Sequence, residues 1–470
     1  MRATFHSLLG CAWGRLVAVG CGIALVLQGC RPGGSGDSAT WPRVTLTPKD
    51  RILILAPHPD DEVLGCGGII QQALAMHVPV QIAFLTYGDN NQWSFLIYRK
   101  HPVLGKEAVQ RMGLVRHDEA VTAATILGVP ADHLTFLGYP DFGTLSMWKS
   151  HWGDRSPFQS MLTRVAAVPY ANALRPGTPY KGEEVLRDLT TVLREVRPTK
   201  VFVSHPAAYN PDHSALYAFT SVALWEVESE LRPDVYPYLI HFRRWPKSYG
   251  YHPTKSLIPP ALLQRQVAWH VDHLMPEAVD RKYRALRAHR TQYAYSARYL
   301  LSFVRANELF GDFPVVPLRP SSSSTMLSSR SVEENGEVPE ELNEQERAMF
   351  VGLADRAVHL DGDRLVLSIA FSRPLAQAVE ASVYFFGYRA DRPFAEMPKL
   401  HVKIGALGHE VADQDRTLPD GTIQITRRPT QFTIRVPLAV LGDPQRILTS
   451  ARTYIGEVPL DWPHGECWSG

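Results

Sequence analysis

A cluster of side chains that can bind a metal ion or transfer a proton follows an apolar run early in the chain. The run is Ile52 to Leu55, and the segment from Pro57 to Glu62 reads Pro-His-Pro-Asp-Asp-Glu. His58 and Asp61 are three residues apart, close enough to share one ion, whereas Asp60 between them would point elsewhere. Proline and aspartate are also common at the start of a helix. Helix initiation alone, however, leaves His58 unexplained.

A second segment repeats this pattern. The apolar residues Val201 to Ser204 lead into a loop that ends in Asn-Pro-Asp-His at residues 210–213. His213 could join His58 and Asp61, and three protein ligands would leave one coordination position for water, as a catalytic zinc requires. A structural zinc site would show four ligands, usually including Cys. The alternative is that His213 is an ordinary residue of a helix start.

Both motifs would be positioned by the ends of strands. Ile52 to Leu55 and Val201 to Ser204 are short apolar runs, which predicts strands buried on both faces. Strand and helix patterns alternate, which predicts an α/β fold, a Rossmann-like and mostly parallel sheet with helices on both faces. Ligands bind at the carboxyl edge of such a sheet. The stretches Gly88 to Leu114 and Trp148 to Pro179 are expected to be loops over the pocket. The other expected elements are a strand at Val80 to Thr86 and helices at Val63 to Met76, Glu119 to Leu127, Glu183 to Val196 and Ser214 to Glu228.

The two motifs resemble those of a known family. Ala-Pro-His-Pro-Asp-Asp-Glu at residues 56–62, followed far downstream by Pro-Asp-His at 211–213, is similar to the PIG-L/LmbE family of zinc-dependent N-deacetylases. This family includes deacetylases of GlcNAc-phosphatidylinositol and of mycothiol synthesis. Segments 116–120, 137–141 and 282–292 also resemble family motifs, so that the resemblance extends over residues 50–307.

The resemblance implies a role for each matching residue. His58, Asp61 and His213 would bind Zn²⁺, and Asp60 would be the general base. The chemistry agrees with this assignment, because zinc lowers the pKa of a bound water and a carboxylate beside the ion can take the proton of that water. The same carboxylate could return the proton to the leaving amine.

Three further positions concern the substrate and the transition state. Arg116 and Asp141 match family positions that hold sugar hydroxyls, although either could be a surface charge. Many family members have His where this chain has Asn210, and that His is thought to stabilise the tetrahedral oxyanion. The Asn210 amide could donate a hydrogen bond instead. His205 or Tyr209 could also take this role.

The amino terminus predicts export and lipid attachment. Residues 1–29 contain an apolar run from Leu16 to Leu27, which is short for a membrane-spanning helix and typical of a signal peptide. Leu-Gln-Gly-Cys at 27–30 resembles the bacterial lipobox, which implies acylation of Cys30 and a lipid-anchored, extracytoplasmic location in the bacterial cell envelope. Residues 30–48 would be a tether. The alternative is an uncleaved anchor or an ordinary secreted protein.

The remaining length is sufficient for two domains. With 470 residues and a net charge of +2, the composition is that of a globular protein and indicates no nucleic-acid partner. Residues 49–316 would form the deacetylase-like domain and 317–345 a linker rich in Ser, Pro and Glu. Residues 346–470 alternate apolar and polar positions, which predicts an all-β sandwich that could bind carbohydrate. Its aromatic residues Tyr384, Phe386, Trp462 and Trp468 could stack on sugars, or they could lie in the core.

The function predicted from these observations is the removal of acetyl from an N-acetylated amino sugar resembling N-acetylglucosamine. The substrate would be a glycan, a glycolipid or a small glycoside. One alternative is hydrolysis of another amide or acyl group by the same chemistry. A second is a non-catalytic glycan-binding lipoprotein, for which Asn210 is the only indication. In a third, the sandwich is a protein-docking module.

Overall fold

A computed structural model describes most of the chain after residue 40. The described residues are 41–90, 105–261, 263–264, 267–312, 315–318, 325–329, 343–455, 458–459 and 464–469. The predicted signal peptide and Cys30, the predicted acylation site, lie outside them. Within this part of the chain, no helix combines the length and the apolar character needed to cross a membrane.

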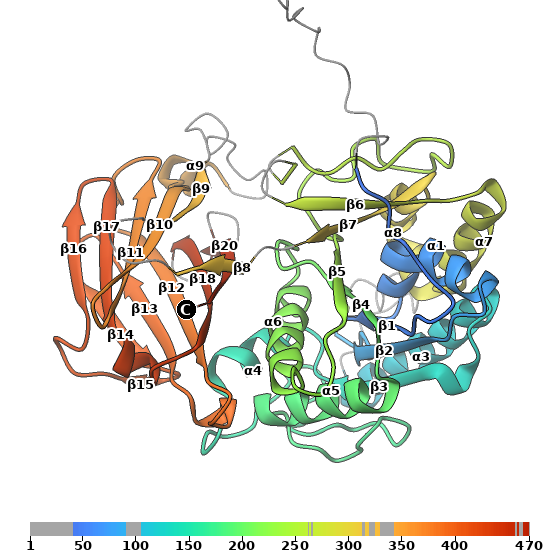
Figure 1. The fold of residues 1–470 in the computed structure, drawn as a ribbon, viewed down its shortest axis with the longest axis horizontal. Helices are drawn as coiled ribbons and strands as arrows, with labels where there is room; N and C mark the ends of the chain where they lie inside the picture. The colour runs from blue at the N-terminus through green and yellow to red at the C-terminus, as the bar shows by residue number, and fades with distance from the viewer. Residues whose placement is uncertain are drawn as a thin grey trace, which may run out of the picture. The chain divides into compact units, whose positions relative to one another are not determined.

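A seven-stranded sheet carries the two predicted motifs (Figure 1). Its strand order is β3-β2-β1-β4-β5-β7-β6, in which the first five strands are parallel and β7 runs antiparallel to both of its neighbours. Every residue of β1 and β4 is buried, as their continuous apolar sequences predicted. The predicted mostly parallel α/β sheet is therefore confirmed. The strands are β1 Ile52–Ala56, β2 Val80–Thr86, β3 Leu134–Tyr139, β4 Lys200–Ser204, β5 Asp234–Tyr238, β6 Ala268–His273 and β7 Asn307–Asp312.

Two groups of helices cover this sheet (Figure 1). Helices α1, α3 and α7 contact one another, and α4 and α5 both contact α6. Helices α1 and α6 begin slightly earlier than predicted, because acidic residues and proline are favoured in a first helical turn. The motif residues themselves therefore form the first turns of these helices. The helices are α1 Asp61–Ala75, α3 Lys106–Leu127, α4 Thr144–Ser150, α5 Gly182–Val196, α6 Pro211–Glu226, α7 Pro276–Ala288 and α8 Arg290–Leu300.

The two long loops expected from the sequence are present only in part. The prediction of a loop from Gly88 to Leu114 is wrong for its last residues, because α3 begins at Lys106. The first turns of α3 contain several charged residues and show no clear apolar stripe, although Val109 and Met112 are buried. The prediction of a loop from Trp148 to Pro179 is wrong for its first three residues, which belong to α4, and residues 151–179 contain no helix or strand.

Two mainly antiparallel sheets make up the C-terminal β region, residues 343–469 together with β8 and β9 (Figure 1). The strand orders are β16-β17-β11-β10-β9 and β15-β14-β13-β12-β18-β20-β8, and β19 pairs with β18. Apolar residues of both sheets form one hydrophobic core. Strand β9 lies within the segment that was predicted to be a linker. The strands are β8 Val315–Pro317, β9 Thr325–Ser329, β10 Leu353–Asp361, β11 Arg364–Phe371, β12 Val379–Tyr388, β13 Lys399–Ile404, β14 His409–Asp413, β15 Arg416–Thr417, β16 Gln424–Arg428, β17 Gln431–Pro437, β18 Arg446–Ile455, β19 Val458–Pro459 and β20 His464–Ser469, and helix α9 is Glu344–Met349.

A buried ion pair fixes α1 against the sheet. Lys282 of α7 donates to Glu308 of β7 at 2.6 Å and to the carbonyl of Leu64 at 2.9 Å. Glu308 also accepts the N–H groups of Gly68 and Ile69 at 2.7 and 3.0 Å. Both charged side chains are almost fully buried. Because α1 begins with a predicted metal ligand, this pair helps to hold that ligand in place.

Removal of Lys282 should therefore destabilise the fold. Lys282→Met is expected to lower the free energy of unfolding by about 3–5 kcal/mol, because it leaves Glu308 buried without its counter-charge. Chemical denaturation would measure this change. Arg284→Met is the matched control on the same helix, since its pair with Asp280 is exposed and such pairs contribute at most about 1 kcal/mol. Equal stability of Lys282→Met and the wild type would contradict the argument.

Candidate functional site

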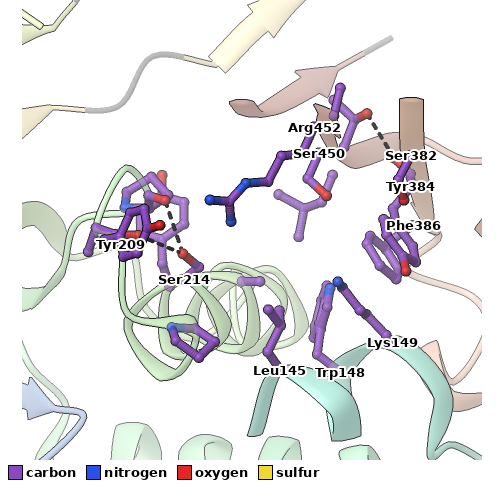
Figure 2. A pocket seen from close by; sticks show the side chains of 18 of the residues that line it. Leu145, Trp148, Lys149, Tyr209, Ser214, Ser382, Tyr384, Phe386, Ser450 and Arg452 are labelled. Atoms are coloured by element: carbon purple, nitrogen blue, oxygen red, sulfur yellow. Dashed lines mark hydrogen bonds between the residues drawn. The ribbon is translucent and has the colours of Figure 1, made fainter. Parts of the chain in front are cut away.

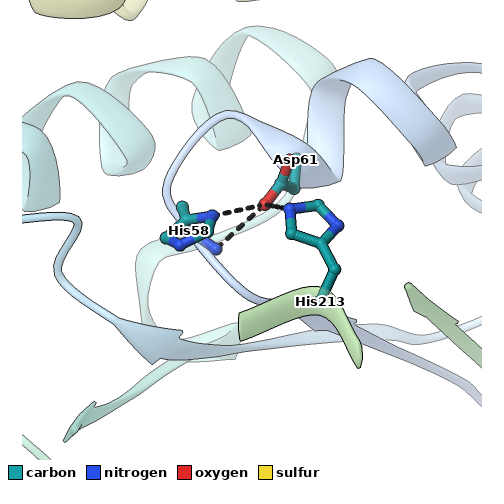
Figure 3. A group of neighbouring side chains, drawn as sticks. All are labelled: His58, Asp61 and His213. Atoms are coloured by element: carbon teal, nitrogen blue, oxygen red, sulfur yellow. Dashed lines mark hydrogen bonds and ion pairs between the residues drawn. The ribbon is translucent and has the colours of Figure 1, made fainter. Parts of the chain in front are cut away.

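The structure brings His58, Asp61 and His213 together at the carboxyl edge of the sheet (Figure 3). Asp61 Oδ2 lies 3.1 Å from His58 Nδ1 and 3.2 Å from His213 Nε2. His58 belongs to the loop after β1, Asp61 begins α1, and His213 lies in the first turn of α6. Strands β1 and β4 are neighbours at the point where the strand order reverses. Open α/β sheets bind their ligands at this point.

The donor atoms of this set fit a metal ion. All three residues are buried, and one potential ligand atom of each lies within 4.8 Å of the others. Among the described residues, Asp61 Oδ1 and His213 Nδ1 have no hydrogen-bond partner, and the only polar contact of His213 Nε2 is the one with Asp61 Oδ2. Buried polar atoms without partners are costly, and a bound cation would satisfy them. Three ligands without Cys are typical of a catalytic rather than a structural zinc site.

Asp212 holds the other ring nitrogen of His58. Its Oδ2 lies 3.2 Å from His58 Nε2 and accepts the N–H of Phe142 at 2.6 Å. Its Oδ1 accepts the hydroxyl of Thr144 at 2.5 Å. A carboxylate on the far nitrogen orients a metal-binding histidine and raises its basicity. If His58 binds a metal ion as predicted, Asp212 would position its ring, while the next residue, His213, is itself a predicted ligand.

Opposite charges determine the protonation of this cluster. Burial opposes protonation of His58, but Asp141, Asp212 and Asp61 together raise the pKa of His58 well above its ordinary value. Burial also opposes ionisation of Asp61, but His213 and His58 hold the pKa of Asp61 well below its usual range. A ligating imidazole must be neutral at its donor atom, so binding of a metal ion would release protons from the cluster.

Asp60, the predicted general base, lies beside the cluster in strained backbone. Its φ of 126° is a value that residues other than glycine rarely adopt. Its N–H donates to Glu62 at 2.9 Å, and its Oδ1 lies 3.5 Å from Arg116 Nη2. Burial raises the pKa of Asp60 to about 7, although the positive charge of Arg116 opposes this shift. A carboxylate that titrates near neutrality can exchange a proton with water.

Arg116 supports the loop that carries Asp60. Its guanidinium is buried and donates to the carbonyls of Pro59 at 2.6 Å and Gly88 at 2.8 Å. Gly88 has a φ of 64°, and a side chain there would collide with the guanidinium. The structure therefore places Arg116 next to the predicted base. Its predicted contact with the substrate stays a prediction.

Asp141, the other predicted sugar-binding residue, also lies against His58. Its Oδ1 is 3.1 Å from His58 Nε2, and its Oδ2 accepts the N–H of Asn90 at 3.0 Å. Asp141 and Asp212 thus face the same ring nitrogen, and with His58 they form a second group whose geometry could hold a metal ion. The predicted contact of Asp141 with a sugar hydroxyl stays a prediction.

The three candidates for stabilising the oxyanion occupy different environments. Asn210 caps α6, because its Oδ1 accepts the N–H of Asp212 at 2.9 Å and its Nδ2 is the group that could donate to substrate. His205 is buried, and burial lowers its pKa to about 3, so its ring is neutral. Tyr209 is 40% exposed. Its ring lies 5.4 Å from the Arg452 guanidinium, in a separate cavity.

His241 was missed by the sequence analysis. It follows β5, and its ring lies edge-on to that of His213 with 5.0 Å between the ring centroids. It also stacks on Tyr299 at 5.6 Å. Burial, aided by the charge of His213, lowers the pKa of His241 to about 3, so the ring is neutral at pH 7. The apolar residues before it, ended by a histidine, are the signal that could have identified it.

Comparisons with known proteins agree with the motifs. Residues 53–224 match the family model described as PIG-L, GlcNAc-PI de-N-acetylase. A 1D-myo-inositol 2-acetamido-2-deoxy-alpha-D-glucopyranoside deacetylase from Kribbella flavida is 28% identical over 293 residues, which cover 56% of this chain and 90% of that protein. The "Probable N-acetyl-alpha-D-glucosaminyl L-malate deacetylase 2" of Bacillus anthracis is 25% identical and is covered to 81%, over 52% of this chain.

A solved structure is similar over part of the chain. It is the N,N'-diacetylchitobiose deacetylase from Pyrococcus horikoshii, with 19% identity, a TM-score of 0.33 and coverage of 53% of this chain and 75% of that chain. The family match spans both motifs and ends before the C-terminal β region. The family match and the curated relatives support an N-deacetylase enzyme.

Asn210 can be tested with two substitutions that separate its cap from its amide. Asn210→Ala is expected to cost about 1 kcal/mol of stability through the lost cap. It should also reduce turnover roughly a hundredfold, the scale for losing one oxyanion donor. Asn210→Ser keeps a cap and removes the amide, so it should restore stability but not turnover. Denaturation and acetate release would measure the two effects. Wild-type turnover in Asn210→Ala would assign the oxyanion to another group, such as His241.

Proposed function

We propose that this chain is a zinc-dependent N-deacetylase that removes the acetyl group from an N-acetylated amino sugar. The observation that carries the proposal is the buried set His58, Asp61 and His213, with the carboxylate of Asp60 beside it. The set offers three N and O ligands, and its unpartnered polar atoms are those that a cation would satisfy.

The residues around the cluster have distinct tasks in this reaction. A bound zinc ion would polarise the amide carbonyl and lower the pKa of a water molecule towards neutrality. Asp60 would accept a proton from the attacking water and return it to the nitrogen of the leaving amine. Arg116, 3.5 Å from Asp60, would keep that carboxylate in place. The Asn210 amide or the neutral ring of His241 would donate to the oxygen that becomes negative.

The proposed substrate is a sugar that resembles N-acetylglucosamine, in a glycan, a glycolipid or a small glycoside. The names of two relatives specify an acetamido-deoxy-glucopyranoside and an N-acetyl-glucosaminyl malate. The family model that matches residues 53–224 is described as a GlcNAc-PI de-N-acetylase. These names support an amino sugar at the cluster. We further propose that the C-terminal β region, which lies outside the match, is a β-sandwich.

Metal content and turnover together test the assignment of the cluster. His58→Ala, Asp61→Ala and His213→Ala should each lose bound zinc, whereas Asp60→Ala should keep zinc and lose at least about a hundredfold in turnover. A chelator should abolish acetate release from N-acetylglucosamine oligosaccharides, and added zinc should restore it.

Asp118→Ala is the control, because that carboxylate is 83% exposed. Full zinc retention in His213→Ala would remove that residue from the site. Oligosaccharide binding without acetate release would indicate a glycan-binding protein, and release of other acyl groups alone would indicate a different hydrolase.

We also propose that Cys30 is acylated and anchors the protein to the bacterial envelope membrane. The support is the sequence Leu-Gln-Gly-Cys after a short apolar run. Metabolic labelling with a fatty-acid probe should mark the wild type, and Cys30→Ser should abolish the label and block maturation at that site. A wild type that is unlabelled and found in the soluble fraction would exclude the lipid anchor.

A further inference from the structure

A cavity next to the first turns of α6 has no part in the proposed chemistry (Figure 2). Its volume is about 340 Å³. Sites for small molecules typically measure roughly 300–1,000 Å³. Its walls are helix α4, the loop from β4 into the first turns of α6, and strands β12 and β18 of the C-terminal β region. All of these elements belong to the compact unit Ser38–Gly470.

Two positively charged side chains line this cavity. Lys149 of α4 places its Nζ 4.4 Å from the centre of the Tyr384 ring. Arg452 extends from β18 across the cavity, and its guanidinium lies 5.4 Å from the Tyr209 ring and 5.8 Å from the Tyr454 ring (Figure 2). Of the described residues that line the cavity, none is Asp or Glu. The local charge of these walls is therefore positive.

The position of Lys149 has an energetic cost. Burial, together with the positive charge of Arg452, lowers the pKa of Lys149 to about 8. Two cations that face the same poorly hydrated space destabilise each other's charged forms. An anion bound between them would offset this cost and form charge-assisted hydrogen bonds with both.

Aromatic rings and hydroxyl groups form the rest of the wall. The rings of Tyr384 and Phe386 are parallel within 2° and 5.8 Å apart, and Trp148 packs 4.9 Å from Phe386. The His401 ring stacks on Tyr384 at 3.9 Å, and Lys149 lies over the same Tyr384 ring. These aromatic residues therefore give the cavity an apolar wall against which the C–H groups of a pyranose ring could pack. The hydroxyls of Ser382 and Ser450 lie in the same cavity and could bond to sugar hydroxyls (Figure 2). Apolar walls with a few convergent polar groups are typical of ligand sites.

The cavity and the candidate metal cluster use residues of the same two helices. Ser214 lines the cavity and directly follows the predicted ligand His213 on α6. Leu145 lines it and directly follows Thr144, whose hydroxyl contacts Asp212. Adjacent residues of α6, and adjacent residues of α4, therefore belong one to the cavity and the other to the cluster or its support.

We propose that this cavity binds an acidic sugar unit, a pyranose with a carboxylate or phosphate group, of the same glycan that carries the N-acetylated sugar. Lys149 and Arg452 bind the anionic group, and the apolar wall to which Trp148, Tyr384 and Phe386 contribute packs against the sugar ring. The assignment of this unit to the substrate rests on the proposed deacetylase function. The binding itself can be measured without turnover.

Calorimetry on the full-length chain with Asp60→Ala, which prevents consumption of the ligand, provides the test. The probes are a hyaluronan tetrasaccharide, in which N-acetylglucosamine alternates with glucuronate, and chitotetraose as its neutral counterpart. N-acetylglucosamine 6-phosphate and N-acetylglucosamine form the pair for a phosphate group. In at least one pair, the acidic probe should bind at least about tenfold more tightly than its neutral counterpart. The pair that shows this difference identifies the anionic group as a carboxylate or a phosphate.

The variants Lys149→Gln and Arg452→Gln should each weaken binding of the preferred acidic probe about tenfold and leave chitotetraose binding unchanged. Lys403→Gln and Arg428→Gln are the controls, because they make the same charge changes at exposed positions of the C-terminal β region. These controls should not alter affinity. Lys149→Gln should keep or raise the thermal unfolding midpoint, because it removes a buried charge, so that lost binding is not a result of unfolding. Arg452→Lys, which keeps the charge and loses the planar fork, is a second variant should Arg452→Gln not fold.

Equal affinity for both members of both pairs would overturn the proposal. So would variants at Lys149 and Arg452 that bind acidic probes as tightly as the controls do. A wild type that binds the acidic probe through these two residues but releases no acetate would support the acidic-sugar site and overturn the proposed deacetylation.

Discussion

The negative charge of the buried Asp61 carboxylate is the constraint that organises the candidate site. Burial of a carboxylate that has no partner costs roughly several kcal/mol of folding free energy. Proteins therefore bury a carboxylate only where opposite charges or a metal ion lie next to it. Here one oxygen of Asp61 contacts both His58 and His213. Those histidines come from different strand ends, so the charge can be accommodated only if β1 and β4 are neighbours and both helices start at the same edge of the sheet.

The groups around this cluster are also buried and polar, and each of them likewise needs a partner from another part of the chain. Asp212 and Asp141 meet the far nitrogen of His58, and the hydroxyl of Thr144 at the start of α4 fixes Asp212. Glu62 is held by His289 at 3.0 Å, which links the motif to the region between α7 and α8. Each of these groups is buried, so the loss of one partner leaves a polar atom without compensation. These contacts would hold the predicted ligands and the predicted base in a fixed arrangement, as preorganisation for catalysis requires.

Helix α4 connects the candidate metal cluster to the C-terminal β region. Its first residue supports Asp212, and Trp148 on the same helix packs 4.9 Å from Phe386 of β12. Lys149 lies next to Trp148, at a position where an apolar side chain could pack without placing a positive charge in the cavity wall. A short helix thus contributes to two sites of different chemistry, one rich in carboxylates and one with positive walls. A substrate with a neutral amide and an acidic neighbouring unit would complement both.

The sequence by itself determined the parts of the structure that depend on local pattern. The apolar runs at β1 and β4, the first-turn residues of α1 and α6, and the histidine and aspartate types of the cluster follow from side-chain chemistry and periodicity within a few residues. Only the tertiary structure decided what meets across the chain. The contact between His58 and Asp212 joins residues 154 positions apart and depends on strand order, which periodicity does not encode. The position of His241, the burial of Arg116 and the cavity with Lys149 and Arg452 were decided in the same way, because each depends on how separate elements pack.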